Sequence, residues 1–292
     1  MKPVIISTMS SIRSSWKIRF IVFLSGAAVM GVELMASRLF APAYGNSIFV
    51  WGGLIGVIML ALASGYWLGG KRADKITSYF ALSNIVMGSG AFIILIPLAT
   101  PYVLELVRIL GLGKTYGPLF AAILLLTGPT VLLGMVSPYA VRLSVNNVVN
   151  LGAVSGSLSS INTAGSIFGT FFTVFVLIPN FGTREIIYSI GVLLIAGSLI
   201  DRSWKEGLFI MFLVFLFLIP AELIGVRLTV LGGKVVHRKE TPYSTLTVMD
   251  NDKQEIRYMF LNNMAHSAMY LNGSTKAVSR YTDYFNLAYG FN

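Results

Sequence analysis

Residues 18–40 read IRFIVFLSGAAVMGVELMASRLF, a stretch in which Arg19, Glu33 and Arg38 are the only charged side chains. A helix crosses the hydrocarbon core of a bilayer with about 20 mostly apolar residues, so this stretch predicts a transmembrane helix. The apolar part of a cleaved signal peptide is shorter, roughly 7–15 residues. The stretch is therefore predicted to remain in the protein as its first span.

Further apolar runs follow along the chain and predict a bundle of helices over residues 18–224. The seven predicted spans are Ile18–Phe40, Ile48–Leu68, Tyr79–Thr100, Tyr116–Val136, Gly152–Ile178, Ile186–Ile200 and Leu208–Ile224. The segment Pro101–Leu112 carries Glu105 and Arg108 and is predicted to lie at the membrane interface. The predicted fold class is a membrane all-α bundle of about seven transmembrane helices with a small C-terminal β-rich subdomain.

The composition supports the lipid bilayer as the main partner of this chain. Of its 292 residues, 55% are hydrophobic and 12% are charged, whereas a soluble domain has roughly 25% charged residues. A net charge of +10 can indicate nucleic-acid binding. Here, however, the basic residues flank apolar runs, which favours a role in topology and in lipid contact, so no nucleic acid is predicted as a partner.

The absence of cysteine excludes disulfides and thiolate sites, and two histidines are too few for a histidine-built metal site, so no metal ligands are predicted.

Lys and Arg are unevenly distributed between the two sets of loops. The N-terminal arm, residues 1–17, and every second loop are rich in them, and cytoplasmic loops carry this excess in membrane proteins. These basic residues are Lys2, Arg13, Lys17, Arg19, Lys71, Arg72, Lys75, Arg142, Arg202 and Lys205. The other loops hold only Arg108, Lys114 and Arg184. The pattern predicts a multi-pass protein of the cell membrane with a cytoplasmic N-terminus, and seven spans would place the C-terminal tail outside. A change of one span would reverse the side of the tail.

The tail, residues 225–292, has the alternation and turn signals of β-structure. Short strands are predicted on either side of Gly232-Gly233, and a hairpin is predicted with its turn at Asp250-Asn251-Asp252. The predicted strands are Val226–Val230, Lys234–His237, Thr245–Met249 and Ile256–Leu261, and a helix is predicted at Tyr281–Tyr289. A unit this small buries little of its surface, so we expect it to depend on the membrane, a second copy or another chain.

Three polar residues inside the predicted spans are candidate functional residues. A carboxylate in hydrocarbon is unfavourable, so Glu33 predicts either a cation or proton site or a structural hydrogen bond to another span, for which Asn162 is a candidate. Arg38 lies about 140° around the helix from Glu33. It is therefore expected to extend to the interface rather than to pair with Glu33.

The end of the second span carries small residues followed by charges. Gly65, Gly69, Arg72 and Asp74 form a pattern found in loops that join neighbouring helices of transporters, although ordinary anchoring by basic residues explains it equally well.

The fifth span carries small residues four positions apart, at Gly152, Gly156 and Ser160 and again at Gly165 and Gly169. That spacing predicts close helix packing.

Several motifs of the tail resemble those of spermidine synthases. Residues 240–248, with Tyr243 and Ser244, resemble the opening strand of that family. Residues 258–267, with Asn262, resemble its next strand and turn, and residues 281–284, with Tyr281 and Asp283, resemble the head of a helix. The first span, the second span's end and the fifth span resemble those of membrane-embedded spermidine-synthase-like proteins. The resemblance implies that Tyr243, Ser244, Asn262, Tyr281 and Asp283 bind substrate.

The resemblance also implies a role in polyamine biosynthesis. In that family a Rossmann-like domain binds decarboxylated S-adenosylmethionine and supplies the catalytic base, and the resemblance stops short of that domain. The chain is therefore expected to be the membrane and lid portion of an aminopropyltransferase-like system, completed by a separately encoded Rossmann-like chain, or to be a truncated relic of such a protein. The expected protein partner is that Rossmann-like chain or a second copy in a homo-oligomer. Ser244, Asn263 and Thr282 replace the Gln, Gly and His that are usual in the family. Two alternatives remain open: a transporter for a cation or polyamine, and a non-catalytic membrane scaffold or anchor.

Overall fold

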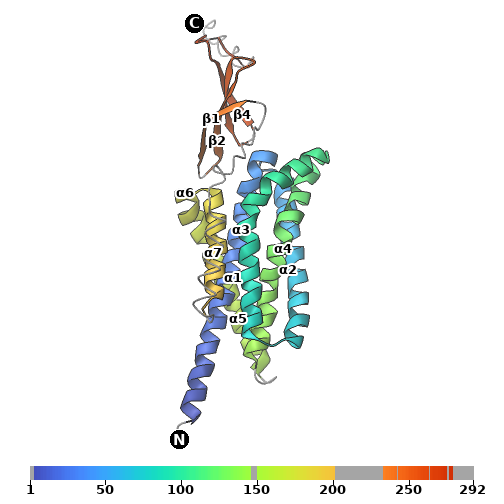
Figure 1. The fold of residues 1–292 in the computed structure, drawn as a ribbon, viewed down its shortest axis with the longest axis vertical. Helices are drawn as coiled ribbons and strands as arrows, with labels where there is room; N and C mark the ends of the chain where they lie inside the picture. The colour runs from blue at the N-terminus through green and yellow to red at the C-terminus, as the bar shows by residue number, and fades with distance from the viewer. Residues whose placement is uncertain are drawn as a thin grey trace, which may run out of the picture.

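The computed structural model describes residues 3–145, 150–200, 233–241, 243–262, 264–274 and 276–278. Long helices lie side by side, and a small sheet stands beyond one end of the bundle (Figure 1). The helices are α1 (Pro3–Tyr44), α2 (Ile48–Lys75), α3 (Tyr79–Ile109), α4 (Gly113–Ser144), α5 (Leu151–Phe172), the π-helix η2 (Thr173–Leu177), α6 (Ile178–Asn180) and α7 (Thr183–Ser198).

Five of the described helices are long and apolar enough to cross a membrane, which makes the chain a multi-pass membrane protein by helix length and composition. They are α1 from Trp16 onward, α2, α3, α4, and the continuous stretch from α5 to α6. The predicted sixth span is α7, whose 16 residues rise about 24 Å and fall short of a hydrocarbon core of about 30 Å. The predicted seventh span, Leu208–Ile224, lies outside the described residues. The expectation of seven spans is therefore corrected to five shown in the described part of the chain.

Two helices extend into the segments predicted at their ends. The predicted N-terminal arm, residues 1–17, is helical where it is described, because α1 runs from Pro3 to Tyr44, and the candidate span within α1 begins at Trp16. The predicted interfacial segment Pro101–Leu112 is helical as far as Ile109, where α3 ends. Proline fits the middle of such helices when neighbouring spans satisfy the freed backbone groups.

Glycines bring the helices of the bundle together at two places. At Gly69 a Cβ would lie 2.6 Å from the Cα of Met135, so the backbones of α2 and α4 meet there. At Gly165 a Cβ would lie 2.1 Å from the carbonyl oxygen of Phe23, so α5 meets α1 equally closely. The predicted packing of Gly165 and Gly169 is thus correct. At Gly152 and Gly156 no described atom would lie within 4 Å of a Cβ, so the described helices do not pack on these two glycines.

The sheet is an antiparallel meander of four strands in the order β1-β2-β3-β4. The strands are β1 (Lys234–Glu240), β2 (Thr245–Asn251), β3 (Ile256–Leu261) and β4 (Met264–Tyr270). The predicted hairpin is the β2–β3 pair. Strand β4 was not predicted, because its sequence MAHSAMY lacks the β-branched alternation that marks a strand. The predicted strand Val226–Val230 and helix Tyr281–Tyr289 lie outside the described residues.

The sheet stands at the end of the bundle where α1 and α3 end and where α4 and α7 begin (Figure 1). The N-terminus of the chain lies at the opposite end. Helix α7 begins at the sheet end and runs toward the opposite end of the bundle. This arrangement positions the candidate site at the junction between sheet and helices.

Candidate ligand-binding site

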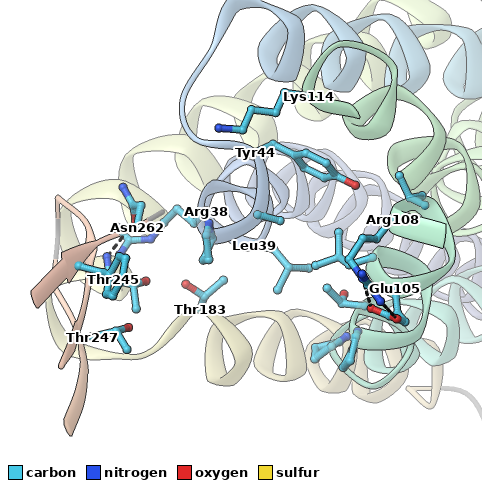
Figure 2. Close-up of a pocket in the computed structure, with 18 of the residues that line it drawn as sticks. Arg38, Leu39, Tyr44, Glu105, Arg108, Lys114, Thr183, Thr245, Thr247 and Asn262 are labelled. Atoms are coloured by element: carbon cyan, nitrogen blue, oxygen red, sulfur yellow. Dashed lines mark hydrogen bonds and ion pairs between the residues drawn. The ribbon is translucent and has the colours of Figure 1, made fainter. Parts of the chain in front are cut away.

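A cavity of about 1110 Å³ lies between the sheet and the end of the helix bundle. Its walls come from the ends of α1 and α3, the beginnings of α4 and α7, and strands β1 to β3. In Figure 2 the strand residues Thr245, Thr247 and Asn262 face the helices across this space, and the Glu105–Arg108 pair lies on the far side. The volume is at or just above the usual upper limit for a small-molecule site, about 1,000 Å³.

Two polar contacts hold the sheet on the helices beside the cavity. Nη2 of Arg38, near the end of α1, donates a hydrogen bond of 2.5 Å to the carbonyl oxygen of Thr241. The carboxylate of Glu240, at the end of β1, accepts a hydrogen bond of 2.7 Å from the backbone N–H of Thr183 at the start of α7. The first backbone N–H groups of a helix lack partners within it and attract a negative charge. Glu240 therefore acts as a cap for α7 that is supplied by the sheet.

Glu240 also interacts electrostatically with Arg38. The same two side chains thus connect three elements, namely α1, α7 and β1. A carboxylate of α7 itself, that of Glu185, accepts a second bond of 3.2 Å from the N–H of Gly182. Arg38 extends to the end of the bundle, where its guanidinium is bound to the sheet.

The charges that line the cavity are predominantly positive. Arg108 forms a two-pronged ion pair with Glu105, with distances of 2.8 and 2.5 Å. Arg38 interacts with Glu240. Lys114 and Arg184 also line the cavity, and no ion pair joins either of them to an acid among the described residues. The cavity therefore contains two positive charges that no carboxylate of the described residues neutralises.

The remaining lining is largely apolar. Leu39, Leu104 and Val107 come from the helices, and Met249 and Phe260 come from the sheet. Ligand sites commonly combine such apolar walls with a few placed polar groups. The arrangement can hold a molecule that has both an apolar part and a negatively charged part.

No protein-family model, curated protein or solved structure matches this chain. The chemistry of the site therefore rests on its own geometry.

Of the three described residues predicted from the spermidine-synthase resemblance, Asn262 alone lines the cavity. Asn262 lines the cavity, and its Oδ1 accepts a hydrogen bond of 3.0 Å from the N–H of Thr245. Tyr243 is 92% exposed and lies outside the cavity lining. The carbonyl oxygen of Ser244 closes a turn by accepting the hydroxyl of Thr241 at 2.7 Å. Tyr281 and Asp283 lie outside the described residues.

The predicted hydrogen bond between Glu33 and Asn162 is absent. Asn162 of α5 instead lies against Gly26 of α1, whose Cβ would be 2.2 Å from the Asn162 carbonyl oxygen. Gly26 is seven residues before Glu33, or about 10 Å along the helix. Glu33 itself is half-buried, and no hydrogen bond or ion pair to a described residue is found for it.

The pattern at the end of the second span is helical rather than a loop, since α2 continues to Lys75. Its members nevertheless join two helices. Gly65 and Gly69 lie against the backbone of α4, and Asp74 forms an ion pair of 3.3 Å with Arg142 of α4. Arg72 is exposed, and its carbonyl oxygen accepts the N–H of Ile76 that ends the helix.

A second cavity, of about 710 Å³, lies between α2, α4 and α5 at the end nearer the N-terminus. Hydroxyl and amide side chains contribute much of its wall, including Ser137, Ser155, Ser159 and Asn162. Among the described residues, no three His, Cys, Asp or Glu side chains lie close enough together to hold a metal ion.

Lys114, Arg108 and Arg184 were not predicted to be site residues. Each was interpreted only as a basic residue of a loop or of the membrane interface. One sequence signal could have indicated their role: all three lie in or beside loops that are otherwise poor in Lys and Arg. Only the fold shows that these loops meet at one cavity.

Proposed function

We propose that this protein binds a substrate at the membrane surface, between its helix bundle and a sheet that serves as a lid. One observation carries the proposal: the sheet is held by Arg38 and Glu240 directly over a cavity of about 1110 Å³. A lid that excludes water strengthens the electrostatic interactions beneath it. The helices then act as both the membrane anchor and the floor of the site.

The finer proposal follows from the resemblance to spermidine synthases. In it, the chain is the membrane and lid part of a polyamine aminopropyltransferase-like system, and a Rossmann-like chain supplies decarboxylated S-adenosylmethionine. The four-stranded sheet and the position of Asn262 at the cavity support it. The excess positive charge of Lys114 and Arg184 does not favour a polyamine, because a polycation would be repelled there.

The lid is tested by the hydrogen exchange of the full chain in lipid nanodiscs. Glu240→Gln removes the charge that caps α7, so amides of β1, β2 and the first turn of α7 should exchange faster. Lys239→Gln is the matched control, since Lys239 is exposed. Lys239 also precedes Glu240 in β1, and neighbouring side chains of a strand point to opposite faces of the sheet. Equal exchange in both variants would contradict the lid.

The aminopropyltransferase proposal has its own test. Native membranes that contain the chain are combined with soluble extract, decarboxylated S-adenosylmethionine and putrescine, and aminopropyl transfer is measured. The proposal expects activity that depends on both fractions and that falls in Thr247→Trp, which fills the cavity from β2. Transfer that is unchanged by removal of the chain would exclude this role.

Transport is a second candidate, and one specific observation favours it. The two cavities lie at opposite ends of the bundle. Glu33 lies on α1 between them, five residues from Arg38 at the first cavity and seven from Gly26, which contacts Asn162 at the second. Reconstituted into liposomes, the protein should then carry a cation or polyamine, and Glu33→Gln should abolish the flux. A flux equal to that of the wild type would count against this candidate.

A further inference from the structure

Four basic residues of the described helices and their connecting loops lie at the sheet end of the bundle, and all four line the same cavity. They are Arg38, Arg108, Lys114 and Arg184. The loops at this end otherwise lack Lys and Arg, as expected for the non-cytoplasmic side of a membrane protein. Basic residues retained there do not serve topology. Their convergence on one cavity indicates that they serve a ligand.

Two of these four cations are available to a ligand. Glu105 occupies the guanidinium of Arg108 through two hydrogen bonds. Arg38 is bound to the carbonyl oxygen of Thr241 and interacts with Glu240. Lys114 and Arg184, from the first turns of α4 and α7, remain without an acid among the described residues. Figure 2 shows the Lys114 side chain extending beside Tyr44 at the edge of the space.

The apolar part of the cavity extends from the sheet toward the membrane. Its lining on α3 runs from Pro97 to Arg108, which corresponds to about 16 Å along the helix axis. Leu104 and Val107 lie on this wall, and Leu39 lies on the facing α1. The cavity is therefore charged near the surface and apolar toward the bundle.

We propose that this cavity binds an amphiphile with a phosphate group, in which Lys114 and Arg184 contact the phosphate and the α1–α3 wall contacts the apolar chain. This inference rests on the proposed function, because it names the substrate class of the same site. Arg and Lys bind phosphate through charge-assisted hydrogen bonds, which are roughly twice as strong as neutral ones.

The test uses the full chain in nanodiscs of phosphatidylcholine, with and without phosphatidic acid, and native mass spectrometry to count bound lipids. The wild type should retain one phosphatidic acid per chain. Lys114→Gln and Arg184→Gln should each weaken retention by about tenfold or more, because each removes a charge-assisted bond. Lys114→Arg should retain binding, because the charge is kept.

Lys75→Gln is the matched control, since Lys75 is exposed at the opposite end of the bundle. Equal loss in Lys75→Gln and Lys114→Gln would overturn the inference, because it would indicate general attraction to anionic lipid. Displacement of phosphatidic acid by inorganic phosphate at a similar concentration would overturn the amphiphile part, because it would show that the apolar wall contributes nothing. Displacement by spermidine would overturn the charge argument.

The inference and the proposed function can fail separately. Hydrogen exchange that supports the lid, together with no retained phosphatidic acid, would reject only the ligand class. Faster exchange of the sheet in Lys239→Gln and Glu240→Gln alike would reject the lid, whatever lipid is bound.

Discussion

Asn262 combines an unusual backbone conformation with a specific hydrogen bond. It follows β3 with φ of +54°, in the left-handed region that asparagine tolerates better than most residues. Its backbone N–H donates to the carbonyl oxygen of Thr245 at 2.8 Å, and its Oδ1 accepts the N–H of the same residue at 3.0 Å. The side chain therefore closes the wall of the cavity where β2 begins.

We expect Asn262→Ala to destabilise the sheet by about 1–3 kcal/mol, because it leaves the Thr245 N–H without its partner and strains the backbone. Asn262→Gly loses the same hydrogen bond but adopts the left-handed conformation freely, so its loss should be smaller. The two variants are compared by hydrogen exchange of β2 and β3. A larger loss in the glycine variant would contradict this account.

Asp250 and Arg257 form the second defined interaction within the sheet. The guanidinium of Arg257 donates hydrogen bonds of 2.7 and 2.8 Å to the Asp250 carboxylate and lowers the pKa of that carboxyl. A carboxyl whose pKa is lowered by folding contributes stability above its ordinary pKa, near 3.9. That contribution is lost as the pH falls through the lowered value.

The sheet should therefore unfold more readily as the pH falls below about 4. Asp250→Asn should reduce this dependence on pH, because the amide has no such proton to gain. Circular dichroism or exchange measured from pH 7 to pH 3 provides the comparison, with Asp252→Asn at the exposed turn as the control. Identical pH profiles for the wild type and Asp250→Asn would show that the pair contributes nothing.

At the scale of elements, two adjacent glycines of α2 have opposite surroundings. A Cβ at Gly69 would lie 2.6 Å from the Cα of Met135 and 2.8 Å from its carbonyl oxygen, so α4 would have to move. At Gly70 no described atom would lie within 4 Å of such a Cβ. Only the first glycine is required by the packing of the helices.

Gly69→Ala should therefore destabilise the bundle by about 1–3 kcal/mol through overpacking. Gly70→Ala should have little effect or stabilise it by up to about 1 kcal/mol, because alanine favours the helix over glycine. Thermal unfolding in detergent checks both variants. A lower melting temperature for Gly70→Ala than for Gly69→Ala would contradict the observed α2–α4 contact.

The spacing of small residues could be seen in the sequence, but not which spacing is used. Gly152 and Gly156 have the same separation as Gly165 and Gly169, yet only the second pair meets a described helix. Whether a small face is used depends on how the helices are arranged around it. That arrangement is set by contacts between segments that are distant in the sequence.

At the scale of the whole molecule, the sheet and the α2–α3 connection lie at opposite ends of the bundle (Figure 1). We predict that these ends lie on opposite sides of the membrane, with the α2–α3 connection in the cytoplasm because of its Lys and Arg content. The chain has no cysteine, so single introduced thiols report position without background.

In intact cells, an impermeant maleimide should label Asn272→Cys, in the turn after β4, and should label Thr77→Cys only after permeabilisation. Both positions are exposed in the structure. Labelling of both thiols in intact cells, or of neither, would contradict the predicted topology.

The residues of the chain were sufficient to predict a helical bundle, most of its first five spans and the β2–β3 hairpin. Apolar length and two-residue alternation are local properties, and local properties can be read in order along the chain. They did not reveal that α3 continues beyond Pro101, that α7 has only 16 residues, or that β4 completes the sheet. The cavity could not be predicted from them at all. Its lining includes Arg38, Lys114, Arg184 and Asn262, which are far apart in the sequence. These residues come to line one cavity only when the sheet docks on the helices. Such proximity is a property of tertiary packing alone.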